Sequence, residues 1–389
     1  MPMREKSNSQ LGESKDIALR RLNWLYKRLK KEPIMWELYK NFIDEYQSLG
    51  YMSEVVDCEE PDITYYISHQ GVYRPQNSSP PLRVVFNASQ ATPTGYSLNS
   101  LLLNGGILQE ELFSTLCHFR THRFAFIVDV KKMYRQILVE DSQQDLLRIL
   151  WKNSDGDSIK IYKLKTVTYG TSCAPFFATR TLKQFFIDEG EKFPFATPVV
   201  MSDFYMDDCL SGSNTLDTPK ELQTELIQML ACCGMELHKW CSNSPQLLSH
   251  NCVNSDYLFD SSNEVKALGL LWKPEVDCFA FRMTVDNSAK YARRTVLSVI
   301  AKTYDYLGFV GPLITKAKIF MQTVWFLNID WNDSLPTKES KEWTQFLDSL
   351  HKVNDLDINR FVLMENLKVV ELHRFSDASE KAYGAVIYI

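Results

Sequence analysis

The sequence predicts an α+β fold divided into two or three subdomains, and three observations lead to this prediction. At 389 residues the chain is too long for one compact core. Apolar residues recur at helical spacing in the first fifty residues and again after residue 287. Between these regions, short β-branched or aromatic runs alternate with turn residues, as is typical of strands. The composition, 45% hydrophobic and 23% charged, is that of an ordinary folded protein.

Charge and cysteine content restrict the class of protein. The net charge of −5 gives no global sign of a nucleic-acid partner, so a local basic patch would have to meet one. The chain opens without an apolar leader and has no apolar run of ~18 residues, which predicts an intracellular protein with no membrane partner. The nine cysteines are then expected as reduced thiols. One group has no standard zinc spacing, and we interpret it as core: Cys232, Cys233, His238, Cys241, His250 and Cys252.

The N-terminal region predicts two helices. Residues 1–15 are polar, and from Asp16 apolar residues recur near a period of 3.6 until Tyr46, with Pro33 separating two segments. Proline and glycine then punctuate residues 50–81, and a β-branched strand follows at 82–89. Arg83 near the start of this strand is either a surface charge at a sheet edge or a ligand for a triphosphate.

The run Phe124–Val128 predicts a buried strand that ends at Asp129. A carboxylate at the end of a buried strand is unfavourable unless it is paired or bound to a metal. The alternative is that Asp129 caps a helix beginning at Val130. From the residues alone, both interpretations stay open.

The middle of the chain predicts further strands, a turn and two helices. Residues 137–165 indicate strands around a turn at Asp155-Gly156, and a Gly/Ser/Pro turn at 166–175 leads into a helix. A second helix is expected at Thr218–Cys233, and a single strand at Lys266–Trp272.

The stretch Ser202–Ser211 predicts a hairpin with a tight acidic turn at Asp207 and Asp208. Two neighbouring carboxylates repel each other, and a divalent cation relieves that repulsion. The dipeptide alone is equally typical of a solvated turn. Together with Asp129, however, it gives three carboxylates at the ends of two strands, the set that two-metal nucleotidyl transfer needs.

A basic helical segment begins at residue 287, and helical spacing continues to about residue 350. Two strands are expected near the end of the sequence, at Leu367–Leu372 and Ala382–Ile389, with Phe375–Ser379 between them. The basic segment is the local patch that the net charge conceals, and its cations are Lys290, Arg293, Arg294, Lys302, Lys316 and Lys318.

At this point the sequence resembles a known family, the reverse transcriptase region of the Pol polyprotein of BEL/Pao-type LTR retrotransposons. The resemblance runs from about Asp16 to the last residue and rests on ordered blocks rather than on one motif. These blocks are Arg83-Val84-Val85-Phe86, Ser97-Leu98-Asn99, Asp129 with Lys132–Ile137, Thr166–Gly170, Pro175-Phe176, Ala178-Thr179-Arg180, Tyr205-Met206-Asp207-Asp208 and Leu268–Trp272.

The resemblance implies a right-hand polymerase. Its fingers would span 60–100 and 135–180, its antiparallel palm sheet with packed helices 101–134 and 181–275, and its helical thumb 276–350. Residues 1–59 would be an N-terminal helical extension, and 351–389 a connection with the start of an RNase H-like domain.

The resemblance also implies roles for individual residues. Asp129, Asp207 and Asp208 would be the catalytic carboxylates that hold two Mg²⁺ ions, with Mn²⁺ as an alternative ion and the Val130 carbonyl as a further ligand. The expected dNTP-binding residues are Arg83, Tyr134, Tyr169, Gly170 and Lys239, with Tyr134 excluding a 2′-hydroxyl and Lys239 protonating pyrophosphate. The primer grip would be Leu268, Gly269, Leu270, Leu271 and Trp272, and the nucleic-acid contacts Lys290, Arg293, Arg294 and Lys302. Tyr134 could instead be a core tyrosine.

The expected activity is RNA-directed DNA synthesis on a primed RNA or DNA template, from dNTPs. Further parts of a Pol polyprotein are expected partners. Asp377 matches the first carboxylate of an RNase H site, and because three more are needed after it, RNase H activity is not expected within these residues. Two alternatives stay open. One is a catalytically silent nucleic-acid-binding remnant, and the other is the peptidase for which the family's 250–389 region is named, although no protease motif is present.

Overall fold

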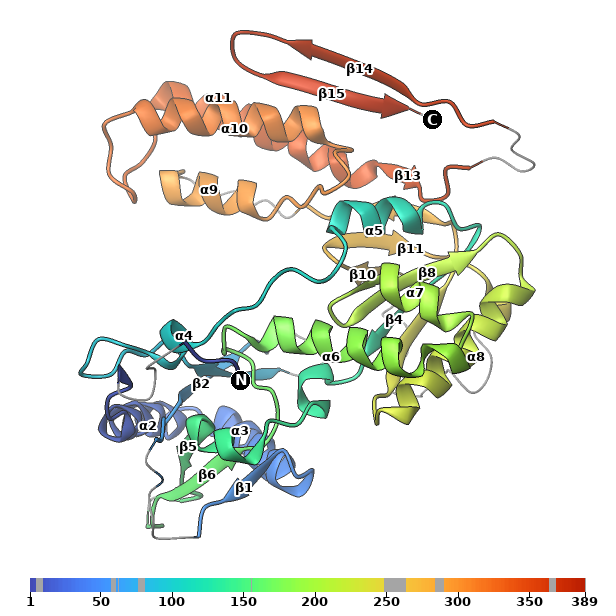
Figure 1. The fold of residues 1–389 in the computed structure, drawn as a ribbon. Coiled ribbons are helices and arrows are strands. Elements are labelled where there is room, and N and C mark those ends of the chain that lie inside the picture. Colours follow the sequence, from blue (N-terminus) through green and yellow to red (C-terminus); the bar gives the residue numbers. More distant parts are fainter. Residues whose placement is uncertain are drawn as a thin grey trace. The chain divides into compact units, whose positions relative to one another are not determined.

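The computed structural model describes residues 1–4, 10–56, 61, 63–75, 81–154, 156–247, 264–283, 290–363 and 369–388. The fold is mixed α+β, and every pair of described strands in its sheets is antiparallel (Figure 1). The chain forms two compact units, and each is described by itself. Unit 1 comprises Met1–Gln109, Lys131–Glu191 and Ala231–Met235, and unit 2 comprises Glu110–Val130, Lys192–Leu230 and Glu236–Ile389.

Unit 1 begins with the two predicted helices, and both are confirmed. They are α2 (Lys15–Leu29) and α3 (Pro33–Ser48), and Pro33 is the first residue of α3, where its missing N–H leaves no hydrogen bond unmade. Their apolar faces pack around Trp151, which is buried and lies 5.4 Å from the ring of Tyr26 and 5.2 Å from that of Tyr39. The amphipathic pattern therefore builds an aromatic core.

Two small sheets and further helical segments complete unit 1. One sheet has the order β1-β6-β5 and the other is the hairpin β2-β3. The elements are β1 (Met52–Glu54), β2 (Ser68–Tyr73), β3 (Leu82–Asn87), α4 (Leu98–Leu101), η1 (Met133–Gln136), η2 (Asp141–Leu147), β5 (Arg148–Trp151), β6 (Lys160–Leu164), α6 (Ala174–Glu189) and the start of η3 (Gly190–Lys192). The strands expected within 137–165 are thus preceded by a 3₁₀ helix, and Asp155 of the expected turn lies outside the described residues.

Unit 2 contains the sheet that carries the acidic hairpin, with the order β7-β8-β4-β9. Helix α5 covers part of this sheet, because Leu116 and Phe119 pack with Ala125, Ile127 and Leu210 in one apolar cluster. The elements of this part are α5 (Leu112–Phe119), β4 (Phe124–Val130), α7 (Ala196–Ser202), β7 (Phe204–Tyr205), β8 (Asp208–Ser213), α8 (Asp217–Cys232), β9 (Leu237–Ser242) and η4 (Pro245–Leu247). The predicted hairpin is confirmed, and α8 agrees within one residue at each end with the expected helix.

A second four-stranded sheet of unit 2, β10-β11-β12-β13, corrects one prediction. The segment Lys266–Trp272, expected as a single strand, contributes to two antiparallel strands, β10 (Val265–Ala267) and β11 (Leu270–Lys273). Leu268 and Gly269 form the turn with φ of +50° and +87°. Two consecutive left-handed residues are the requirement of a type I′ hairpin turn, and leucine in the first position gives no sign of it. The remaining strands are β12 (Cys278–Ala280) and β13 (Asp357–Asn359).

Three helices of unit 2 share one core in which Trp343 is sandwiched between two phenylalanines. Its ring stacks on Phe320 and on Phe346, each at a centroid distance of 5.0 Å. The helices are α9 (Arg293–Ala301), α10 (Gly311–Phe326) and α11 (Thr337–His351), followed by η5 (Lys352–Asp355). The helical spacing predicted for this region is confirmed.

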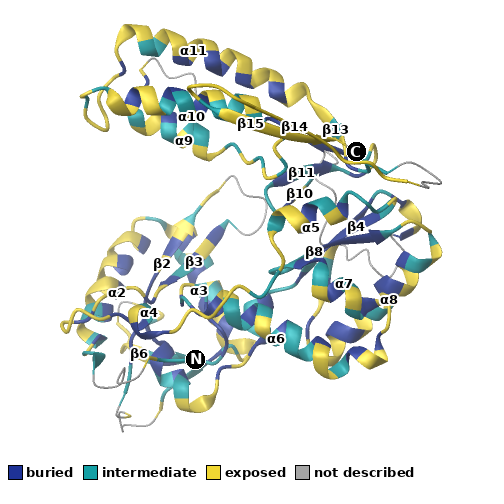
Figure 2. Ribbon diagram, turned by 45° about the horizontal axis from the view of Figure 1, so that its top comes forward, coloured by how far each residue is buried: buried dark blue, intermediate teal, exposed yellow. Residues whose placement is uncertain are grey.

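The C-terminal hairpin pairs β14 (His373–Ala378) with β15 (Tyr383–Tyr388). Asp377 therefore lies within a strand. The strand predicted at Leu367–Leu372 is not present in its described part, because residues 369–372 have no regular structure. Residues 364–368 and Ile389 are outside the described residues. Both strands are exposed along their whole length, in contrast to the mostly buried β4 and β8 (Figure 2). Among the described residues, no helix has the length and apolar character needed to cross a membrane.

Candidate functional site

The three predicted carboxylates meet at one end of the β7-β8-β4-β9 sheet of unit 2. Asp129 on β4 is directly opposite Asp208 on β8, and residues opposite each other in antiparallel strands project from the same face. Asp207 lies in the two-residue turn between β7 and β8, where Met206 has φ of +59°. The N–H of Val130 donates to the carbonyl oxygen of Asp207 at 2.8 Å, which fixes the turn to the end of β4.

Asp129 is not a helix cap. It belongs to β4, and the next helical element, η1, begins at Met133 and has Lys132 as its N-cap residue. The capping alternative is therefore wrong, and the carboxylate ends a buried strand, as the apolar run before it indicates.

A bulge in the sheet brings the side chains of Lys239 and His238 to Asp129. Between the pairs Ile127↔Cys241 and Asp129↔His238, two residues of β9 face one residue of β4. Such a bulge re-aims a side chain, and Lys239 within it has φ of +58°. The ammonium of Lys239 donates to Oδ2 of Asp129 at 2.7 Å, and Nε2 of His238 lies 3.4 Å from the same oxygen.

The pKa values of the three carboxyl groups diverge. Burial acts to raise the pKa of Asp129, but the hydrogen bonds from His238 and Lys239 outweigh it and leave that pKa below its ordinary value. Burial and the charge of Asp129 raise the pKa of Asp207. Burial, with the charges of Asp207 and Asp129, raises the pKa of Asp208 to about 7. Crowded carboxylates of this kind are stabilised by a hard divalent cation, and their oxygens are the ligand type that magnesium takes. The three do not bring their oxygens within 4.8 Å of one another.

Four of the five residues expected around the nucleotide lie in unit 1 and form a connected group, and the fifth, Lys239, lies in unit 2. The rings of Tyr134 and Tyr169 meet edge to face at 4.4 Å, and the guanidinium of Arg83 lies 5.8 Å from the ring centre of Tyr169. Arg83 is exposed on β3, the edge strand of a two-stranded sheet. Tyr134 is half-buried.

Position 170 requires glycine, because a side chain does not fit there. Its φ is +99°, and a Cβ built on it would lie 2.0 Å from the carbonyl oxygen of Phe86. The amide of Asn99 fastens the same turn, donating to the carbonyl of Gly170 at 2.8 Å and accepting the N–H of Ser172 at 2.8 Å. The sequence marked Asn99 as a family block without indicating this contact.

In unit 2, the segment expected as the primer grip is the β10–β11 hairpin. Trp272 is buried, and its indole N–H donates to Asp277 at 3.0 Å. A cavity of about 250 Å³ lies beside the hairpin. Its lining includes Lys266, Gly269, Arg282, Lys302 and Tyr304.

The cations expected to contact nucleic acid differ in their surroundings. Lys290, Arg294 and Lys302 are exposed. Arg293 instead donates to the backbone carbonyls of Val324, Trp325 and Leu327, so its guanidinium caps the C-terminal end of α10. Asp377 is exposed on β14.

A second group of ligating side chains escaped the sequence analysis. His118, His122 and Asp203 bring their ligand atoms within 4.8 Å of one another, as no other three such side chains do in the part of the chain that the structure describes. The spacing His-x₃-His is a known zinc-ligand spacing and was the available signal. The cysteine–histidine group that the sequence predicted as core is only partly so. Cys241 is buried, but Cys232 is exposed at the end of α8, and His250 and Cys252 lie outside the described residues.

Comparison with protein families matches residues 292–389 to a model described as the Pao retrotransposon-like RNaseH-like domain. The match covers α9, α10 and α11, which the sequence analysis expected as a thumb, as well as β13 to β15. A search of curated proteins gives no match.

Among solved structures, the fold is similar to one described as the foamy viral protease-reverse transcriptase dRH in complex with ds DNA. The identity is 12% and the TM-score 0.58, over 90% of this chain and 52% of that one, so the present chain spans about half of its length. This likeness is one of fold. Together with the family match, it supports the resemblance to a BEL/Pao-type retroelement Pol region.

Proposed function

We propose that the chain is an RNA-directed DNA polymerase that extends a primer 3′-hydroxyl with dNTPs. This proposal rests mainly on one observation: Asp129 and Asp208 lie directly opposite each other on neighbouring strands, and Asp207 lies in the adjoining turn. Three carboxylates at one sheet end suit two-metal nucleotidyl transfer, and the fold likeness to a reverse transcriptase supports the same reaction. The fingers, palm and thumb divisions expected from the sequence belong to this proposal.

The carboxylates would hold magnesium, with Asp129 and Asp207 as the main ligands and Asp208 and the Val130 carbonyl completing the site. Bound magnesium would stabilise the attacking oxygen and the leaving pyrophosphate. The protein's own contacts act on these ligands. Hydrogen bonds from Lys239 and His238 lower the pKa of Asp129, which favours its ionised form. The hydrogen bond from the Val130 N–H holds the turn that contains Asp207. Since Lys239 already contacts Asp129, a cation at that oxygen competes with the ammonium group.

Nucleotide selection is assigned to the aromatic group of unit 1. The edge-to-face contact with Tyr169 fixes the ring of Tyr134, and a fixed ring is what steric exclusion of a 2′-hydroxyl requires. Arg83 is exposed and carries the charge-assisted donors that a triphosphate accepts. Gly170 keeps the turn next to Tyr169 in a conformation that other residues rarely adopt.

The proposed partner is a primed template, bound in part by the exposed cations of the α9 region. Lys290, Arg294 and Lys302 would contact phosphates, since such contacts position a duplex without reading its sequence. The solved relative of similar fold is described in complex with ds DNA, which supports this choice of partner.

Primer extension by the purified chain tests the proposal. The assay uses a DNA primer on an RNA template, Mg²⁺ and dNTPs. Asp348→Asn is a matched control, because Asp348 is an exposed aspartate on α11. Extension by the parent chain and the control, with a loss of about 10²–10³-fold or more in Asp129→Asn and Asp207→Asn, is expected. Undiminished extension by both variants would refute the assignment.

One observation favours a second candidate, a catalytically silent nucleic-acid-binding protein. The ion pair between Lys239 and Asp129 neutralises one of the carboxylates that magnesium needs. A gel shift of a primed template that occurs without any extension, at every Mg²⁺ and Mn²⁺ concentration tried, would select this candidate. The peptidase alternative gains no support from the residues that the structure describes.

A further inference from the structure

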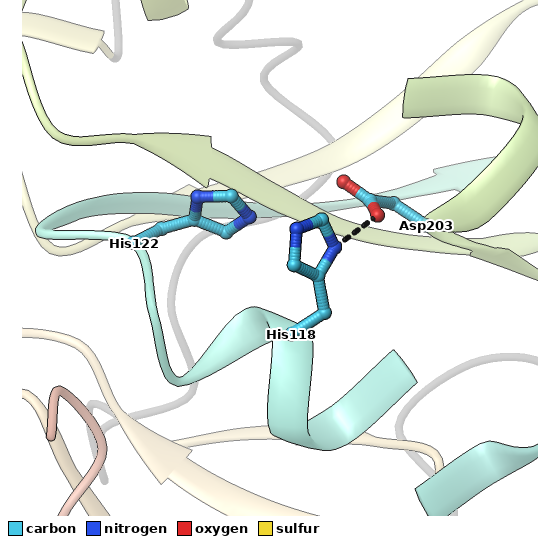
Figure 3. A group of neighbouring side chains, drawn as sticks. All are labelled: His118, His122 and Asp203. Carbon is cyan, nitrogen blue, oxygen red and sulfur yellow. Dashed lines mark hydrogen bonds and ion pairs between the residues drawn. The ribbon is translucent and has the colours of Figure 1, made fainter. Parts of the chain in front are cut away.

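Two histidines and an aspartate gather at the base of the acidic hairpin, away from the three carboxylates at its tip. His118 lies in the last turn of α5, His122 in the loop between α5 and β4, and Asp203 directly before β7. All three belong to unit 2. In Figure 3 the imidazole of His118 lies between the ring of His122 and the carboxylate of Asp203.

Asp203 is a buried carboxylate that is held in one orientation. Its side chain is 1% exposed, and it accepts hydrogen bonds from Ser202 Oγ at 2.8 Å and Ser211 Oγ at 2.6 Å. Nδ1 of His118 lies 2.7 Å from its Oδ1. Within the described part of the chain, its titratable partner is this histidine rather than a lysine or arginine. Metal ligands are typically oriented by surrounding hydrogen bonds of this kind.

His122 contributes a buried ring nitrogen to the group. Its Nε2 is buried and has no hydrogen-bond partner among the described residues. Buried polar atoms are nearly always satisfied, and an exception calls for a missing water, ion or function. The ring of His122 lies 4.7 Å from the ring of His118 at an interplanar angle of 64°. The unsatisfied imidazole therefore belongs to the same group.

We propose that His118, His122 and Asp203 bind one Zn²⁺ ion that fastens the end of α5 to the base of the acidic hairpin. Two imidazoles and a carboxylate are a ligand set that zinc prefers and magnesium does not. Ligands at zinc distances in a tetrahedral site lie about 3.3 Å apart, so atoms already within 4.8 Å need only small side-chain movements. The remaining coordination position is open to water.

Zinc binding to the purified full chain tests the proposal independently of polymerase activity. The chain is treated with a chelator, dialysed and titrated with Zn²⁺ against a chromophoric competitor, in excess Mg²⁺ that fills the carboxylate site. We expect one equivalent of Zn²⁺ to bind and to raise Tm. His118→Gln and His122→Gln should each weaken this binding by more than about 100-fold. Co²⁺ in place of Zn²⁺ should give visible d–d absorption in the parent chain and lose it in both variants.

Two further variants separate this site from others. His351→Asn removes an exposed histidine on α11, and His238→Asn removes the histidine beside Asp129; both should keep the full equivalent of Zn²⁺. Circular dichroism matched to the parent establishes that the glutamine variants are folded. If either glutamine variant is unfolded, Asp203→Asn is used in its place. Retention of tight binding in His118→Gln and His122→Gln, loss of it only in His238→Asn, or no binding by the parent chain would each overturn the proposal.

Discussion

At the scale of single residues, the carboxyl group of Asp208 links stability to pH. An unfolded aspartate has a pKa of about 3.9. In the folded chain, burial and the charges of Asp207 and Asp129 raise the pKa of Asp208 to about 7. Between these two values the folded state holds a proton that the unfolded state has released. The free energy of unfolding therefore falls as the pH rises through this window.

Asp208→Asn should remove this fall in the free energy of unfolding with rising pH, because the amide stays uncharged. At pH 8 without divalent ions, we expect the variant to have a free energy of unfolding higher than that of the parent by roughly 1–4 kcal/mol. At pH 4 the difference should nearly vanish. Urea denaturation at both pH values measures it, with Asp348→Asn as the control. An equal effect at both pH values would show that the charge of Asp208 is not responsible.

The ring of Tyr134 carries the prediction about sugar selection. Tyr134→Val removes the ring that Tyr169 holds in place, so we expect ribonucleotides to gain about 10–100-fold in kcat/KM relative to deoxynucleotides. Tyr134→Phe keeps the ring and should keep the selection. Single-nucleotide incorporation with paired dNTP and rNTP substrates measures the ratio. A core role alone would instead lower both rates together and leave the ratio unchanged.

Sequence patterns predicted which residues form the acidic group, but they did not predict which side chains contact these residues. The apolar run before Asp129 and the hairpin pattern around Asp207 led to the correct strands. The ion pair of Lys239 with Asp129 depends on a bulge in β9, and nothing in the local sequence signals a bulge. His118 and His122 had a signal in their spacing, but Asp203 is distant in sequence and reaches them only through the fold.

At the scale of elements, the β10–β11 turn requires glycine at position 269, and one substitution tests this requirement. Gly269 has φ of +87°, and a Cβ there would meet Tyr306 and Tyr304 only at ordinary contact distances of 3.5 and 3.6 Å. Gly269→Ala should therefore lower the free energy of unfolding through its backbone alone, by about 1 kcal/mol. Urea denaturation measures the change.

Gly106→Ala is the matched control for this turn. Gly106 lies outside the left-handed region, and a Cβ built on it has nothing within 4 Å. We expect its unfolding to resemble that of the parent chain. If the two alanine variants lost the same stability, the conformational requirement for glycine at position 269 would be mistaken.

Elements with a strong period could be predicted, and those set by turn geometry could not. Helices α2, α3, α8 and α11 follow from apolar residues at a spacing near 3.6. The turn inside the segment Lys266–Trp272 could not be predicted, because Leu268 occupies it with a positive φ that leucine seldom adopts. At the C-terminal end, the pairing of β14 with β15 decides the strand bounds, and it draws Phe375–Ala378 into a strand.

At the scale of the whole molecule, the chain enters each unit three times. Residue 130 ends one segment of unit 2, and residue 131 resumes unit 1 in the middle of a predicted motif. Long-range contacts decide such a division, while sequence patterns report local structure. This is why residue patterns alone indicated only that there are several subdomains, whereas the interleaved divisions expected in the sequence analysis came from the family resemblance.

Binding to a primed template belongs to this scale, and its salt dependence tests the role of Lys302. Lys302 is exposed and lines the cavity beside the β10–β11 hairpin. Lys302→Ala should weaken binding about equally for all sequences and reduce the slope of log affinity against log salt by about one. Lys341→Ala, an exposed lysine on α11, should leave the slope as it is. Fluorescence anisotropy at several salt concentrations measures both slopes, and identical slopes for the two variants would remove Lys302 from the interface.

The most direct test of the central claim is primer extension by the parent chain and by Asp207→Asn. Asp207 belongs to the turn that completes the carboxylate group, and its replacement removes a ligand charge while keeping the size of the side chain. The account predicts Mg²⁺-dependent extension of a DNA primer on an RNA template by the parent chain, and loss of extension in the variant with template binding retained. Equal extension by both proteins would contradict it.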